Sequence, residues 1–335
     1  MSEVAVITGG TAGVGRAVAR EFAEHGADVA VLARGVERLE ATRRELESMG
    51  VRALAIPTDV ADADAVERAA EQVTQELGAI DVWVNDAMTT VFAPFLEITP
   101  EEFRRATEVT YLGFVYGTMS ALRRMKARDT GTIVQVGSAL AYRSIPLQSP
   151  YCGAKHAIVG FTDSIRSELI HENSRVQLTV VHLPAMNTPQ FSWCRTKLPR
   201  HPQPVPPIYQ PEVGARAIYD AAHARRREVY VAWPTVKAIY GQEIAPGYAD
   251  RYLAANAIDG QQTSEPVQND RPDNLFNPVA GDWAAHGIFG DRASNISPLT
   301  WLDLHRESVA LGAAAILGFG LAMSKTRRKY LPPKR

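Results

Sequence analysis

A short apolar run near the N-terminus leads directly into a glycine-rich loop and from there into a helical pattern. Residues 4–8 are β-prone, glycines follow at positions 9, 13 and 15, and apolar side chains then recur at helical spacing from Val14 to Phe22. Glycine permits a tight turn and close approach of a phosphate, and a helix N-terminus attracts negative charge. This order predicts the phosphate-binding corner of a parallel α/β sheet, although a turn that needs glycine only for its shape has the same composition.

The chain then alternates strands with helices at regular intervals. Strands that alternate with helices of this length form a parallel sheet covered on both faces. In such a sheet, ligands bind at the carboxyl ends of the strands. Further strands are expected at residues 28–33, 51–57, 80–85, 131–138 and 176–183, and helices at residues 14–25, 36–48, 62–77 and 100–128 and around Tyr151.

Length and composition narrow the class of protein. The 335 residues exceed an average domain, so we expect one core domain with a C-terminal extension. A net charge of −1 gives no basic field and argues against nucleic acid as a partner. Cys152 and Cys194 are the two cysteines, which suits a reducing compartment, and no Cys/His spacing indicates a metal site. Without a basic and apolar leader after Met1, we expect a cytoplasmic protein.

Tyr151 and Lys155 are four residues apart in an expected helix, and Ser138 ends the strand before that helix. Positions four apart share one helix face, so both side chains can reach the same substrate. A free tyrosine has a pKa of about 10, and a neighbouring ammonium is expected to lower that pKa enough for proton exchange near neutral pH. We therefore expect Tyr151 to act as general acid/base and Ser138 to orient the substrate oxygen, although such a pair also arises by chance.

The residues after the second and third strands bear on the cofactor. The second strand ends in Ala33 and is followed by Arg34, where an NAD site carries Asp or Glu. A guanidinium matches a 2′-phosphate in charge and geometry, so NADP(H) is favoured over NAD(H) unless Arg34 is only a solvated loop charge. Asp59 could accept a hydrogen bond from an adenine amino group, but Asp59 or Asp62 could equally cap the next helix.

With these motifs in place, residues 3–233 resemble the short-chain dehydrogenase/reductase family. The resemblance rests on Thr8-Gly-x-x-x-Gly-x-Gly15, Asp59, Asn85-Asp86-Ala87, Ser138, Tyr151-x-x-x-Lys155 and the segment from Pro184 to Thr188. It implies a Rossmann-type, doubly wound parallel sheet of about seven strands, the last at residues 228–232. It also implies that Tyr151 exchanges the proton, that Lys155 lowers its pKa and binds the nicotinamide ribose, and that Ser138 steadies the substrate oxygen. The cofactor contacts that it implies are Thr8, Gly9, Thr11, Gly13, Val14, Gly15, Arg34, Asp59, Val60, Asn85, Ala87, Tyr151, Lys155, Pro184 and Thr188.

The chain departs from the family pattern in three segments. Thr110 stands where the family usually has an Asn that takes part in a water-linked proton relay; its hydroxyl can still bind a water but cannot replace the amide. Asp86 and Met88 replace an Asn and a Gly, and Met88 either narrows the nicotinamide pocket or fills a gap beneath a loop. Pro184 is followed by Ala185 instead of Gly, and Thr188 arrives one residue early.

Residues 185–210, which in this family set substrate specificity, combine apolar side chains with many prolines. The prolines disfavour helix and predict a stiffened lid. The apolar side chains either line a pocket for a lipophilic substrate or pack against the core. Four basic side chains could bind a carboxylate or phosphate or be solvated; they are Arg195, Lys197, Arg200 and His201.

The C-terminal part exceeds the usual family length. We divide the chain into a core with its lid at residues 1–256, an irregular arm at residues 257–300 and an apolar helix with a basic tail at residues 301–335. Residues 236–256 are expected to be helical with a break near Pro246. Residues 309–323 lack polar side chains and basic residues follow, so residues 309–329 could touch a membrane surface or pack against a partner subunit.

The sequence therefore predicts an NADP(H)-dependent oxidoreductase that acts on a small carbonyl compound or secondary alcohol, a lipophilic one if the apolar lid side chains line the pocket. A homo-oligomeric state is also expected. The alternative is a nucleotide-binding scaffold or sensor with the same fold and little turnover, which Thr110, Asp86 and the long C-terminal part would suit.

Overall fold

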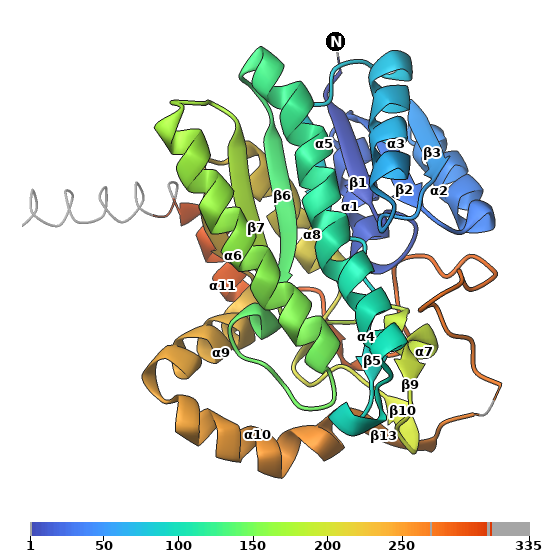
Figure 1. Cartoon of the computed structure of the whole chain (residues 1–335), viewed down its shortest axis with the longest axis vertical. Coiled ribbons are helices and arrows are strands. Elements are labelled where there is room, and N and C mark those ends of the chain that lie inside the picture. The colour runs from blue at the N-terminus through green and yellow to red at the C-terminus, as the bar shows by residue number, and fades with distance from the viewer. Residues whose placement is uncertain (1, 269, 307–308, 310–335) are drawn as a thin grey trace, which may run out of the picture.

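A computed structural model describes residues 2–268, 270–306 and 309. Within that part of the chain, seven parallel strands form a central sheet in the order β12-β7-β6-β4-β1-β2-β3 (Figure 1). The predicted doubly wound Rossmann-type fold is confirmed. The strands of this sheet are β1 (Val4–Thr8), β2 (Asp28–Ala33), β3 (Ala53–Pro57), β4 (Val82–Asn85), β6 (Thr132–Ser138), β7 (Gln177–Leu183) and β12 (Glu228–Tyr230).

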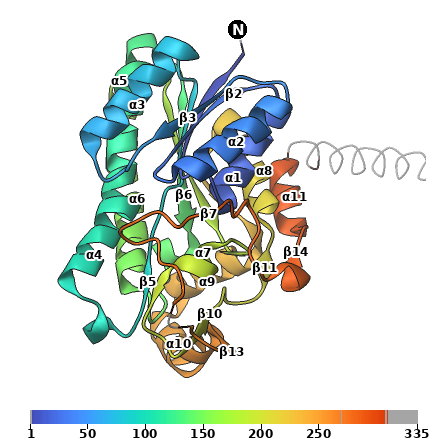
Figure 2. The same ribbon diagram turned by 90° about the vertical axis from the view of Figure 1, so that its right-hand side faces the viewer.

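Helices cover both faces of this sheet, as Figure 2 shows from the side. One hydrophobic core lies between the sheet and α1, α2 and α8, and a second lies between the sheet and α3, α5 and α6. The strands are buried on both faces, which explains their nearly continuous apolar sequences. The bounds are α1 (Gly13–Glu24), α2 (Val36–Ser48), α8 (Pro211–His223), α3 (Ala63–Glu76), α5 (Gly113–Arg128) and α6 (Ser149–His171).

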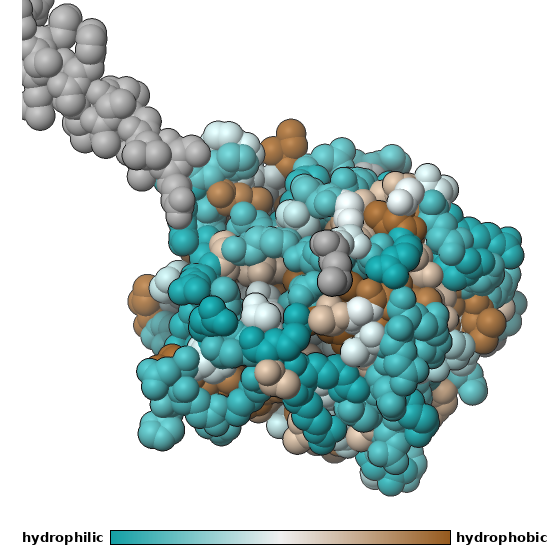
Figure 3. Space-filling view, turned by 90° about the horizontal axis from the view of Figure 1, so that it is seen from above, coloured by the Kyte–Doolittle hydropathy of each residue, from teal (hydrophilic) through white to brown (hydrophobic). Residues whose placement is uncertain are grey.

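The strand order indicates the edge of the sheet at which a ligand binds. The chain winds outward from β1 in both directions, so neighbouring loops separate after β1 and β4, and such a switch point is where open α/β sheets bind ligands. The carboxyl ends of the strands point toward the lower end of Figure 1, where α7, α9 and α10 lie. The opposite end, seen from above in Figure 3, is a face on which hydrophilic residues predominate.

Helix caps decide one alternative that the sequence leaves open. Asp62 is the N-cap of α3, and its side chain accepts a hydrogen bond from the Ala65 amide at 3.0 Å. Asp59 instead accepts from the Ala61 amide and from Arg105, at 3.1 and 2.6 Å. The capping role therefore belongs to Asp62.

The helix expected at residues 100–128 is interrupted. It begins as α4 (Pro100–Thr107), where Thr99 and Glu102 form a capping box, passes through one π-helical turn (Glu108–Leu112) and continues as α5. Such wide turns are uncommon and often lie at functional sites. The π-helical turn contains Thr110.

The predicted lid is built from short elements. The helix α7 (Gln190–Trp193) is followed by short strands that pair with distant segments of the chain. The conformation of the lid is therefore held by strand pairing as well as by its prolines. These pairs are β9 (Arg195–Thr196) with β5 (Val91–Phe92), β10 (Arg200–Pro202) with β13 (Gln262–Pro266), and β11 (Ile208–Tyr209) with β8 (Ala185–Met186) and β14 (Ala293–Ser294).

The C-terminal part contains more regular structure than expected. The break near Pro246 is confirmed, because α9 (Ala232–Ile244) ends there and α10 (Pro246–Gly260) begins. The boundary expected at residue 256 falls inside α10, and the division of the chain into three parts stays a prediction. The arm expected to be irregular at residues 257–300 contains the end of α10, β13, a 3-10 turn (Gly290–Arg292), β14 and the start of α11. Residues 270–289 are irregular, but they pack on the core: Leu275, Ala285 and Phe289 are buried.

The apolar C-terminal stretch lies almost entirely outside the described residues. The last described helix is α11 (Pro298–Leu304), and the proposed membrane contact at residues 309–329 stays a prediction. Within the described part of the chain, no helix has the length and apolar character needed to cross a bilayer.

Candidate active site

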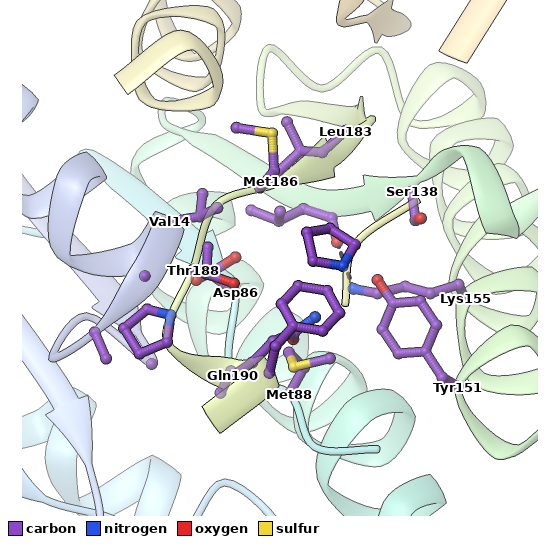
Figure 4. A pocket seen from close by; sticks show the side chains of 18 of the residues that line it. Val14, Asp86, Met88, Ser138, Tyr151, Lys155, Leu183, Met186, Thr188 and Gln190 are labelled. Carbon is purple, nitrogen blue, oxygen red and sulfur yellow. Dashed lines mark hydrogen bonds between the residues drawn. The ribbon is translucent and has the colours of Figure 1, made fainter. Parts of the chain in front are cut away.

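A cavity of about 430 Å³ lies at the carboxyl edge of the sheet, between the core and the lid. Its wall includes the glycine loop after β1, the segment after β4, the end of β6 and the first turns of α6. Its size falls in the range typical of small-molecule sites. Figure 4 shows Tyr151 and Lys155 reaching into this cavity from α6, with Ser138 beside them.

Ser138, Tyr151 and Lys155 line the same part of the cavity. Ser138 is the last residue of β6, and Pro150 in the first turn of α6 helps to start the helix that carries the other two. The Lys155 Nζ atom donates to the Val136 carbonyl at 2.7 Å and lies 5.5 Å from the centre of the Tyr151 ring. The structure therefore brings together the three side chains that the sequence singles out.

The expected lowering of the Tyr151 pKa is not found. Burial raises the pKa of Tyr151 above its ordinary value, and the hydrogen bond with Ser138 offsets only part of that rise. The expectation is wrong here because a buried phenolate loses more hydration than its neighbours restore. A phenol with a raised pKa is protonated at neutral pH and can donate its proton.

Asp86 adds a carboxylate to this group. It lines the cavity after β4 and accepts a hydrogen bond from the Gly15 amide. Burial raises the pKa of Asp86, while the nearby Lys155 ammonium lowers it; burial likewise lowers the pKa of Lys155, and Asp86 raises it. The two groups thus stabilise each other's charged forms inside the cavity.

The glycine loop leaves no room for side chains at two positions. Gly9 has φ +74°, and a Cβ atom there would lie 2.8 Å from the Ala87 Cα atom. A Cβ atom on Gly15 would lie 2.5 Å from the Gly9 carbonyl oxygen. These close approaches keep the loop tight against the sheet, and Thr11, Gly13 and Val14 of this loop line the cavity, where open α/β folds hold a phosphate.

Two arginines line the far end of the cavity. Arg34 follows β2, and Arg38 lies one turn into α2. Arg38 is 8 % exposed, and its Nε atom has no hydrogen-bond partner among the described residues. Arg38 is not among the residues that the sequence singles out, although it lies in the first turn of the helix that follows Arg34.

Most of the expected cofactor residues line the cavity; these are Gly9, Thr11, Gly13, Val14, Arg34, Asp59, Val60, Ala87, Pro184 and Thr188. Thr8, Asn85 and Gly15 do not. The Thr8 hydroxyl accepts from the Asp86 and Ala87 amides, and Asn85 bonds with Trp83, Thr118 and Gln135 inside the sheet. These three residues lie outside the cavity wall and help to hold the loops that form it.

Thr110 also lies outside the cavity wall. Its hydroxyl donates to the Thr89 carbonyl at 2.8 Å and accepts from the Thr89 amide at 3.0 Å. A hydroxyl has one proton to donate, so Thr110 has none left for a water-linked relay. The expected contribution of Thr110 to proton transfer therefore finds no support in this geometry.

The lid residues divide between the two roles that the sequence leaves open. Phe191, Trp193 and Val205 line the cavity. Leu198 and Ile208 do not line it; they pack in a hydrophobic cluster with Phe92 and Phe289, and Phe191 belongs to both groups. Three of the four basic residues form ion pairs within the chain: Arg195 and Lys197 pair with Glu102, and Arg200 pairs with Asp259. The His201 Nδ1 atom lies 2.8 Å from the Pro202 carbonyl oxygen. None of the four lines the cavity.

A buried polar network on the neighbouring strands β7 and β12 contacts the backbone of Ser138. His182 on β7 is fully buried; its Nδ1 atom lies 3.1 Å from the Ser138 carbonyl oxygen and its Nε2 atom 3.1 Å from a Glu228 carboxylate oxygen. Tyr142 and Tyr230 also donate to Glu228, at 2.7 and 3.1 Å. Although burial opposes ionisation, these hydrogen bonds lower the pKa of Glu228 to about 2.

Comparison with known proteins identifies the family. A family model described as short chain dehydrogenase matches residues 3–197. The chain belongs to this family. An uncharacterized oxidoreductase of Bacillus subtilis, YxnA, is 32% identical over 281 residues, which cover 83% of this short-chain dehydrogenase and 79% of that protein. The oxidoreductase class of the chain is thereby shown.

Two further matches are informative. The 3-dehydrosphinganine reductase of Danio rerio is 32% identical over 192 residues, which cover 56% of this chain and 57% of that protein. An alcohol dehydrogenase from the archaeon Thermococcus sibiricus, solved with 5-hydroxy-NADP, matches with a TM-score of 0.59 and 28% identity. That match covers 95% of the archaeal chain and 68% of this short-chain dehydrogenase, so about a third of the present chain lies outside it.

Proposed function

We propose that this short-chain dehydrogenase is an NADP(H)-dependent oxidoreductase that reduces a carbonyl or oxidises the corresponding secondary alcohol. One observation carries the proposal: the glycine loop and the group of Ser138, Tyr151 and Lys155 line the same cavity. A dinucleotide whose pyrophosphate is held by the loop would have its nicotinamide end beside these side chains. A scaffold without turnover is not favoured, because it needs no such group.

The protein's part in the reaction follows from its side chains. When bound, the nicotinamide cofactor supplies or accepts the hydride. In the reductive direction the Ser138 hydroxyl donates a hydrogen bond to the substrate oxygen, and the Tyr151 hydroxyl gives that oxygen its proton. The Lys155 ammonium stabilises the phenolate that remains. Burial keeps the Tyr151 phenol in its protonated form at neutral pH, the form that donates in this direction.

The cofactor preference is inferred from the basic end of the cavity. Arg34 and Arg38 line it, and β2 ends in Ala33 instead of an acidic residue. Two guanidinium groups favour a 2′-phosphate, whereas a ribose with free hydroxyls needs a carboxylate. The NADP analogue bound by the archaeal alcohol dehydrogenase supports a nicotinamide cofactor for this chain.

The substrate is proposed to be a lipophilic carbonyl compound or alcohol. Phe191, Trp193, Val205 and Leu253 give the lid side of the cavity an apolar wall. The paired state of Arg195 and Lys197 argues against recognition of an anionic group there. Cytoplasmic location and a homo-oligomeric state stay predictions from the sequence.

The test is turnover of a panel of ketones, aldehydes and secondary alcohols, followed by the nicotinamide absorbance with NADPH, NADH and their oxidised forms. We expect turnover with at least one apolar member and a preference for NADPH. The Arg34→Ala variant should weaken NADPH binding about 10-fold or more and NADH binding much less, since each charged hydrogen bond contributes about 1.5–3 kcal/mol. Equal losses for both cofactors would refute the phosphate role of Arg34.

A further inference from the structure

The irregular segment between β13 and β14 crosses the mouth of the cofactor cleft. We call residues 274–287 the strap. Figure 2 shows this segment, in orange, passing between α1 and α2 on one side and α7 on the other. Its residues Asn274 and Pro278 line the same cavity as the glycine loop and Tyr151.

One end of the strap holds two arginines. The carbonyl groups of Asn274 and Phe276 accept hydrogen bonds from the Arg34 guanidinium, and the Leu275 carbonyl between them accepts from Arg105 Nε at 3.2 Å. Leu275 is fully buried and anchors this part of the strap on the core. A guanidinium has five N–H groups, so Arg34 retains donors for a ligand after binding the strap.

The middle of the strap contacts the phosphate-binding corner. The Gly13 amide donates to the Ala284 carbonyl at 3.1 Å, and the Gly281 amide donates to Glu37 at the start of α2 at 2.9 Å. Asp282 lies 3.5 Å from Arg16 on α1. The strap is therefore attached to both helices whose N-termini face the cofactor site.

The strap is also attached to the lid. The Asn274 amide donates to the Trp193 carbonyl at 3.0 Å, and the Trp193 and Trp283 rings pack edge to face with centroids 5.2 Å apart. At the far end, the Gly287 amide donates to the Asn187 carbonyl at 3.1 Å. Asn187 precedes Thr188, one of the cavity-lining residues.

We propose that the strap is part of the cofactor site: it forms the outer wall of the adenosine end and holds Arg34 in position to bind the 2′-phosphate. This inference rests on the proposed function. Because the strap bridges the phosphate corner and the lid, a bound dinucleotide leaves only after these contacts open. The consequence is slow dissociation of the cofactor, with the larger effect on NADPH because Arg34 is held by the same segment.

The experiment measures cofactor dissociation from the full-length protein by stopped-flow, using the fluorescence of bound NADPH and NADH. Trp283→Ala removes the ring contact with the lid without touching a proposed cofactor residue. Its matched control is Trp301→Ala on α11, which is 54% exposed. We expect the dissociation rate of NADPH to rise about tenfold in Trp283→Ala and to stay at the wild-type value in Trp301→Ala, since affinity changes act mostly through this rate.

A second pair of variants covers the case in which Trp283→Ala does not fold. A Cβ atom on Gly287 would lie 2.4 Å from the Thr188 carbonyl oxygen, whereas on Gly290 the nearest atom is 3.9 Å away. Gly287→Ala should therefore force the strap outward and speed dissociation, and Gly290→Ala should not.

The outcomes separate this inference from the proposed function. Dissociation rates that match the controls in both strap variants would overturn the strap inference while the proposed function stands. Tighter binding in the strap variants would also overturn it, because the strap would then be an obstacle instead of a wall. A wild-type protein that binds neither NADPH nor NADH would overturn both.

Discussion

At the scale of single residues, two buried charged groups of the site depend on each other. Lys155 and Asp86 are both withdrawn from water in the cavity wall, and each favours the ionised form of the other. The Lys155 ammonium lies over the Tyr151 ring, with Nζ 5.5 Å from the ring centre. The charge of Lys155, and with it the activity, should therefore depend on Asp86.

The Asp86→Asn variant tests this dependence. An amide oxygen can still accept from the Gly15 amide, but it no longer attracts the Lys155 ammonium, so the pKa of Lys155 falls. Because an ammonium loses its proton as the pH rises through its pKa, the alkaline limb of the kcat/KM profile should move to lower pH. Asp64→Asn, in the exposed first turn of α3, is the control. Identical pH profiles for wild type and Asp86→Asn would contradict the coupling.

The residue types of the site could be predicted, but their states could not. Ser138, Tyr151 and Lys155 follow from local spacing, because a helix face and a strand end fix where such side chains point. The direction of the Tyr151 pKa depends on burial beneath the lid. The use of the Thr110 hydroxyl depends on Thr89, which is distant in the sequence. Neither leaves a local signal.

At the scale of elements, the long helix α5 is held close to β4 by a glycine. A Cβ atom on Gly117 would lie 2.2 Å from the Asn85 Oδ1 atom and 2.8 Å from the Trp83 Nε1 atom. Those two atoms are hydrogen-bonded to each other at 2.8 Å inside the sheet. The absence of a side chain at Gly117 thus allows the helix to pack against this polar network.

Gly117→Ala should therefore lower the free energy of unfolding by about 1–3 kcal/mol, the usual cost of overpacking a core. The matched change is Gly160→Ala on the exposed side of α6, where an added Cβ atom meets nothing within 4 Å. That change should raise the free energy of unfolding by up to about 1 kcal/mol, because alanine favours helix. Urea unfolding measures both, and a stable Gly117→Ala protein would show that the packing is less tight than described.

Elements with strong periodicity were predictable, whereas those fixed by distant contacts were not. The helix expected at residues 36–48 is found with those bounds as α2 (Val36–Ser48). The π-helical turn at Glu108–Leu112 has no sequence pattern of its own. Residues 274–287 look like a linker because their order comes from hydrogen bonds to Arg34, Gly13 and Trp193.

At the scale of the whole molecule, the cavity is assembled from parts of the chain that are far apart. The glycine loop, the end of β6, the start of α6, the lid and the strap each supply one wall. The doubly wound sheet brings the first four together at its carboxyl edge, as in other open α/β folds. The C-terminal part then closes the cleft from outside the family core.

The measurement that tests this account most directly compares Tyr151→Phe with wild type in one substrate turnover assay and one NADPH titration. The exposed Tyr248→Phe variant serves as control, because that ring lies 71% exposed on α10. We expect Tyr151→Phe to lower kcat by about 10²–10⁴-fold, the usual contribution of a positioned acid/base, and to change NADPH affinity far less. A Tyr151→Phe protein that keeps most of the wild-type rate would show that Tyr151 is not the acid/base.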